Sequence, residues 1–167
     1  MQNFRSELCG FCLLLTNMCF GEYYADANFG FSNGLMYGGA ITTVVNAHQV
    51  SVFGEYTQEF TFSQPGRDNA TVGILVGKDM LRTRAYIEPA IGVGITKIME
   101  QGRLLESYWI GSRYENVDHF TASLPVQLGI GYRFRFFAGG ILFRGNINPV
   151  RNYCSAMLCL SGGKMGG

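Results

Sequence analysis

His48 and His119 are the two histidines of this 167-residue chain, and either could act as general base for a neighbouring hydroxyl nucleophile. Thr121 and Ser123 alternate with His119 in the sequence, so a strand would place all three on one face. Ser123, however, would lie about 13 Å from His119 along a strand, beyond hydrogen-bond reach. Thr121 is nearer, but threonine seldom serves as the nucleophile. Catalysis through His119 is therefore only an alternative, and we expect no enzyme.

Charged residues of both signs share the polar side of several alternating segments: Glu55, Glu59, Glu88, Arg133 and Arg144. If these segments enclose a common interior, the glutamates could face the arginines across it. Buried pairs of this kind hold the register at little net gain in stability. Along a water-filled passage the same charges would instead line a narrow channel for small solutes. We expect a structural network, because side chains nearly fill the interior of a small barrel.

The segment 100–118 (EQGRLLESYWIGSRYENVD) is the longest connection that the sequence predicts. It contains the only tryptophan of the chain and four more residues of the types that anchor interfaces. These candidates for an exposed interaction site are Arg103, Tyr108, Trp109, Arg113 and Tyr114. Because function concentrates on loops held by a rigid scaffold, contact with an extracellular protein or envelope partner is one interpretation of this segment. Alternatively, the segment extends its flanking strands or caps the fold.

The composition excludes several classes of protein. Charged residues make up 15% of the chain and the formal net charge is +1, so no basic excess exists to bind nucleic acid. The histidines and the five cysteines form no cluster with metal-ligand spacing, and we expect no metal or cofactor. Cys154 and Cys159 would lie on opposite faces of a strand and cannot pair with each other.

Apolar residues recur with period two after residue 22, which predicts strands. The clearest case is 119–136 (HFTASLPVQLGIGYRFRF), where Leu, Ile, Val and Phe alternate with small or polar residues. We predict eight strands, at 23–31, 35–46, 48–62, 69–79, 83–99, 117–135, 136–148 and 152–165. Short and longer connections alternate between them, which is typical of an all-β, eight-stranded antiparallel up-and-down barrel.

One face of the strands carries almost no charge, whereas the other is rich in Gly, Ser and Thr. The apolar face suits contact with lipid, and the small residues suit a narrow lumen. Aromatic residues near the strand ends, at Tyr56, Phe60 and Phe62 and around 132–137, resemble the interfacial girdles of transmembrane barrels. The alternative is a soluble, lipocalin-like carrier that turns its apolar face inward to bind an apolar ligand.

Residues 1–21 precede the strands and have Arg5 near the start, an apolar run over 9–15, and small residues at Cys19 and Gly21. This pattern predicts a secretory signal peptide, and its length is too short for a membrane-spanning helix. The barrel domain would then occupy residues 22–167.

Three segments carry a family resemblance: 124–134 (LPVQLGIGYRF), 139–149 (GGILFRGNINP) and 155–164 (SAMLCLSGGK). They resemble strands of small OmpA/OmpX-like outer-membrane β-barrel proteins of Gram-negative, Bacteroidetes-type bacteria. The resemblance covers residues 22–165, although this chain lacks the closing aromatic residue that is common there. It implies a bacterial outer-membrane location, contact with outer-membrane lipid, and a structural or surface-interaction role. A lipid-modifying outer-membrane enzyme is the catalytic alternative.

Overall fold

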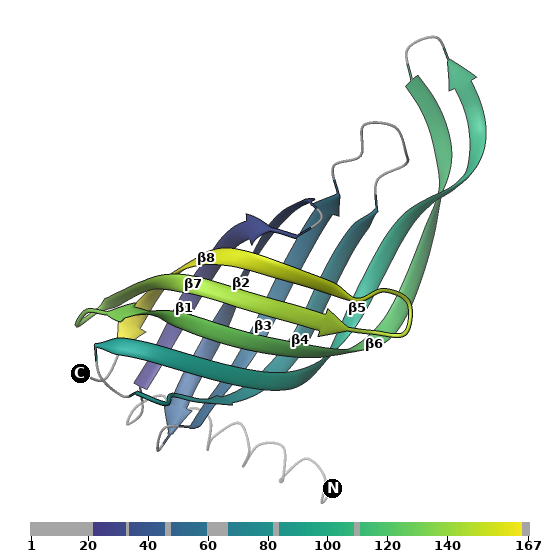
Figure 1. Cartoon of the computed structure of the whole chain (residues 1–167). Helices are drawn as coiled ribbons and strands as arrows, with labels where there is room; N and C mark the ends of the chain where they lie inside the picture. The colour runs from purple at the N-terminus through teal and green to yellow at the C-terminus, as the bar shows by residue number, and fades with distance from the viewer. Residues whose placement is uncertain are drawn as a thin grey trace, which may run out of the picture.

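The computed structural model describes residues 22–32, 34–45, 48–59, 67–81, 84–108 and 111–164, so the predicted signal segment lies outside the described residues. Eight antiparallel strands close into one barrel in sequence order, which confirms the predicted fold class (Figure 1). They are β1 (Glu22–Phe31), β2 (Gly34–Val45), β3 (His48–Glu59), β4 (Asp68–Lys78), β5 (Ala85–Tyr108), β6 (Gly111–Arg133), β7 (Phe137–Ile147) and β8 (Tyr153–Lys164). Among the described residues, no helix is long and apolar enough to cross a membrane.

The barrel closes through β1 and β8, which pair from Tyr23 with Lys164 to Phe31 with Ala156. The β2–β3, β4–β5 and β6–β7 connections lie at the same end as the start of β1 and the end of β8. We call this the termini end. The opposite end, where β5 and β6 project beyond the other strands, is called the hairpin end (Figure 1).

In the body of the barrel, the described side chains alternate between the lumen and the outer surface. On β8, for example, Tyr153, Ser155 and Met157 are buried, whereas the residues between them are exposed. The outward set is large and apolar, with Val93 and Ile95 of β5 exposed by 64% and 62%. Cys154 faces outward and Cys159 inward, and both are free thiols. Exposure of this many large apolar side chains around a whole barrel is not the surface of a water-soluble protein.

Aromatic side chains gather near both ends of the outer surface. At the termini end, the rings of Phe134 and Phe137 stack at 4.3 Å, and Tyr132 lies 5.2 Å from Phe134. Toward the hairpin end, Tyr37 and Tyr56 lie 5.3 Å apart on β2 and β3. Phe60 and Phe62 lie outside the described residues. Two such belts are typical of barrels whose ends lie at membrane–water interfaces.

The prediction of a long loop at 100–118 is wrong over most of that segment. β5 continues to Tyr108 and β6 begins at Gly111, so the segment is a β-hairpin that extends both strands. Register shifts between Gln101 and Glu106 are the physical reason for the error. Such shifts move successive residues from one face to the other, and the alternation that signals a strand is lost.

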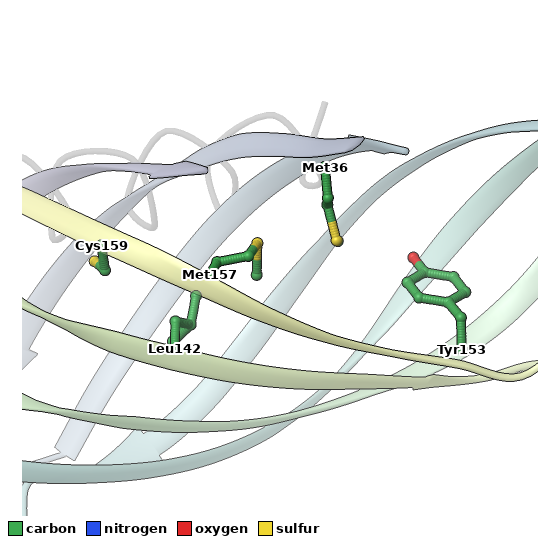
Figure 2. Packing of buried hydrophobic residues seen from close by; sticks show 5 residues of the cluster. All are labelled: Met36, Leu142, Tyr153, Met157 and Cys159. Atoms are coloured by element: carbon green, nitrogen blue, oxygen red, sulfur yellow. The ribbon is translucent and has the colours of Figure 1, made fainter. Parts of the chain in front are cut away.

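Apolar side chains also pack inside the lumen. One cluster near β8 contains Met36, Leu142, Tyr153, Met157 and Cys159, and Figure 2 shows these side chains within the barrel. A second cluster joins Phe53 and Leu75 with two alanines, Ala40 and Ala90. The lumen is therefore packed like a small core as well as being polar.

Tyr86 fits over glycines of two neighbouring strands. A Cβ atom at Gly140 would lie 2.5 Å from the Tyr86 hydroxyl oxygen and even closer to the carbonyl oxygen of Ile130. At Gly54, in contrast, a Cβ atom would meet no heavy atom within 4 Å. Tyr86 therefore packs closely against the β6–β7 wall inside the lumen, whereas a methyl group added at Gly54 would contact no other residue.

We expect Gly140→Ala to lower the free energy of unfolding by about 1–3 kcal/mol, because the added methyl group overpacks the lumen. Gly54→Ala is the matched control and should be neutral or slightly stabilising. Urea unfolding in detergent micelles, followed by far-UV circular dichroism, measures both. Equal effects of the two substitutions would show that the wall at Gly140 is not closely packed.

Candidate functional site

The central feature of the lumen is an ion pair that spans it. Nη1 of Arg144 on β7 lies 2.6 Å from Oε2 of Glu55 on β3, and both side chains are 1% exposed. Arg144 also donates to Oε1 of Gln127, from Nε at 3.1 Å and from Nη2 at 2.5 Å. Its guanidinium carbon lies 4.4 Å from the centre of the Phe53 ring. A buried charge paired in this way is poorly placed to attract a passing solute.

A hydroxyl and amide network continues from Glu55 toward β4, β5 and β8. The Tyr153 hydroxyl donates to Glu55 Oε1 at 2.5 Å and accepts from Asn146 Nδ2 at 2.8 Å. The Thr71 hydroxyl oxygen lies 3.0 Å from that of Tyr153 and 2.9 Å from that of Thr96. Five strands are joined by these contacts, so the network fixes how the walls of the barrel face one another.

A second charged group lies toward the termini end. Arg133 forms ion pairs with Glu88 and with Asp79, and its guanidinium carbon lies 4.8 Å from the centre of the Tyr86 ring. The Tyr24 hydroxyl is within 3.4 Å of Glu88 Oε2. Sequence reasoning identifies Arg133 and Glu88 but does not name Asp79, although Asp79 ends the predicted strand at 69–79 and continues the lumen-facing alternation of β4.

A third group lies toward the hairpin end, where Glu59 forms an ion pair with Arg151. Sequence reasoning misses Arg151 as well, because it stands in the β7–β8 connection. That connection is ordered by Asn148, whose Oδ1 accepts hydrogen bonds from the backbone N–H of Val150 at 3.1 Å and of Arg151 at 2.7 Å. The turn therefore presents Arg151 to the lumen.

Between the central ion pair and the charged group near the termini end, the lumen retains a cavity of about 30 Å³. Its lining includes Tyr24, Gln49, Glu88, Gln127 and Arg133. A cavity needs roughly 10–15 Å³ to hold one water molecule, so this one has room for very few. Paired charges and packed side chains fill the rest of this level. The arrangement favours a structural network over the alternative of a solute channel.

The two histidines lie at opposite ends of the barrel. His119 is exposed and pairs with Ile98 toward the hairpin end, whereas His48 follows the β2–β3 turn and faces outward. Ser123 is 4% exposed in the lumen wall, and its hydroxyl has no hydrogen-bond partner among the described residues. Over the described ranges, no three His, Cys, Asp or Glu side chains are grouped to hold a metal ion.

The predicted interaction residues fall on the extended hairpin. The register pairs Glu106 with Arg113, Leu104 with Tyr114, and Tyr108 with Gly111. Arg103 lies within the register shift between Gln101 and Leu104. Trp109 lies outside the described residues.

We expect Arg144→Met to lower the free energy of unfolding by about 3–5 kcal/mol, because Glu55 is left buried without its partner. Adding Glu55→Leu should recover most of this loss, since the double variant has no charge left unpaired. Arg67→Met is the control, because its pair with Glu100 is partly exposed and should contribute at most about 1 kcal/mol. Additive losses in a double-mutant cycle of Glu55 and Arg144 would contradict the direct pairing.

No family model matches the sequence, and no curated protein matches it. Among solved structures, Neisserial surface protein A is similar, with a TM-score of 0.59 and 12% identity over 87% of this chain and 95% of that chain. A major outer-membrane protein from Thermus thermophilus gives a TM-score of 0.62, 10% identity, and coverage of 86% and 98%. The N-terminal β-barrel domain of Pseudomonas aeruginosa OprF gives a TM-score of 0.56 and 12% identity, over 86% of this chain and 98% of that chain. This chain therefore has the fold of small outer-membrane barrel proteins.

Proposed function

We propose that this protein is an integral outer-membrane barrel that anchors a projecting β-hairpin at the cell surface, with a structural or surface-interaction role. The observation that carries the proposal is the outer surface, which is apolar around the barrel and bounded by aromatic belts. The same proposal includes that the barrel is OmpA/OmpX-like and that it comes from a Bacteroidetes-type bacterium.

Strand length supports the membrane location. The strands other than β5 and β6 have 10 to 12 residues. A tilted strand needs about 9–11 residues to cross the hydrocarbon layer. The large apolar side chains of the barrel point outward. A lipocalin-like carrier would have them inside, so the barrel does not have that arrangement.

The hairpin supports the surface-interaction role. β5 and β6 have 24 and 23 residues, about twice the length of their neighbours. The excess projects beyond the barrel at the hairpin end (Figure 1). β5 continues for nine residues beyond Met99, the partner of Asp68 at the start of β4, and at about 3.4 Å per residue this reaches roughly 30 Å past β4. Its two outer backbone edges have no neighbouring strand in the barrel, and such edges can pair with a strand of a partner. An extracellular protein or another envelope protein is therefore the partner that we propose.

The test replaces residues 102–115 by Asn-Gly, which joins the paired residues Gln101 and Asn116 by a tight turn. We expect both this shortened barrel and the intact protein to stay in the outer-membrane fraction and to migrate differently on denaturing gels before and after boiling. It should lose crosslinks to surface partners that the intact protein forms on living cells.

Two results would contradict the proposal separately. If both forms crosslink to the same partner equally, the hairpin is not the interaction surface. If the intact protein is absent from the membrane fraction and shows no heat-dependent shift, the membrane location is wrong.

A further inference from the structure

The outer surface is hollowed where β4, β5 and β6 meet near the termini end. An open groove of about 450 Å³ lies there, and its lining is mostly apolar. This volume falls within the range of about 300–1,000 Å³ that is typical of small-molecule sites. The lining residues come from the three strands: Val76, Gly77, Lys78, Pro89, Ala90, Ile91, Val126 and Gln127.

Pro89 accounts for the groove. The β4–β5 ladder ends where Gly77 pairs with Ala90, one residue before the ladder would reach the proline, which has no N–H to donate. The next backbone hydrogen bond between the two segments runs from Met80 N to Ile87 O at 3.0 Å. The wall is therefore interrupted between these two contacts, at a level where the outer surface is apolar.

A cation stands at the edge of this apolar groove. Lys78 is exposed at the end of β4, and its register partner on β3 is His48, which is also exposed on the outer face. The nearby carboxylates, Asp79 and Glu88, turn into the lumen and pair with Arg133. The groove thus combines an apolar surface with a positive charge on the outer side.

The other exposed charges at the termini end have the same sign. Arg84, Arg135 and Lys164 are exposed there, and the acidic Glu22 lies on the lumen side of β1. Among the described residues, this rim is therefore basic. An anionic group at the membrane surface is the ligand that such a rim attracts.

Because the proposed function places the hairpin end at the cell surface, the termini end lies at the periplasm-facing leaflet. We propose that the groove binds one acyl chain of an anionic phospholipid of this leaflet, with the lipid phosphate held by Lys78 and His48. The proposal rests on the membrane location proposed above and adds a specific lipid site to it. The outward side chains of Val76, Ile91 and Val126 contact the chain, and Lys78 selects the headgroup by charge. A free phosphate would satisfy the cations but leave the apolar groove empty.

Native mass spectrometry of the detergent-solubilised protein tests this site with dioleoyl phosphatidylglycerol as the anionic probe and dioleoyl phosphatidylcholine as the zwitterionic one. The expected result is one tightly held phosphatidylglycerol per barrel and weaker binding of phosphatidylcholine. Lys78→Gln should weaken phosphatidylglycerol about fivefold, the effect of one cation near an anionic group. Lys164→Gln removes the same charge from the same end without touching the groove, and should change binding little.

A second pair of variants tests the groove itself. Val126→Phe fills it and should weaken both lipids, whereas Leu158→Phe, at an outward position of β8 away from the groove, should not. Glycerol phosphate, which has no acyl chain, should not compete. All four variants are first checked for the heat-dependent gel shift, so that loss of lipid is not mistaken for loss of fold.

Equal losses in Lys78→Gln and Lys164→Gln would overturn the site, because they would reflect only the overall charge of the rim. Competition by glycerol phosphate, or equal effects of the two phenylalanine variants, would overturn the role of the groove. Any of these results in a barrel that still enters the membrane contradicts only this proposal. Failure to enter the membrane contradicts the proposed function instead.

Discussion

The pairing of β1 with β8 is the constraint on which the rest of the structure depends. It joins the first and last strands over nine residue pairs and leaves the barrel body without a free edge. A closed ladder satisfies the backbone groups internally, so the outer face can be wholly apolar. Closure at eight strands also sets the width of the lumen, and only small or mutually paired side chains fit there.

The narrow width of the lumen explains why charged side chains of opposite walls pair inside it. Arg144 and Glu55 meet across the lumen because opposite walls are close enough for two side chains to span the distance between them. Charge buried in this way contributes little net stability, but it penalises any arrangement that separates the partners. The charged groups are therefore better explained as a device that holds the walls in register than as a path for solutes.

The sequence predicts the parts of the fold in which alternation is unbroken. Residues 119–133 show the period-two pattern clearly, and β6 confirms it. Glu55, Glu88, Arg133 and Arg144 lie within such segments, so the alternation of faces alone is enough to place them in the lumen. Asp79 continues the alternation of β4 by one residue, so that pattern alone is enough to place it in the lumen.

Turns and register are harder to predict. Arg151 reaches the lumen from the β7–β8 connection, where the alternation of faces gives no information. The sequence predicts a loop where the hairpin lies, because register shifts hide its strands. The groove depends on where Pro89 falls in the pairing of β4 with β5, and the sequence alone does not predict that register.

The central claim is that the apolar outer face meets lipid, and nitroxide labels on that face test it most directly. Labels at Val72, Val93 and Ile95, each exposed by more than 60%, would be compared with one at Val150 in the β7–β8 turn, all in phospholipid bilayers. The account predicts frequent collisions with dissolved oxygen and rare collisions with a water-soluble nickel complex at the three strand positions, and the reverse at Val150. If the nickel complex relaxes all four labels equally, the outer face meets water and the account is wrong.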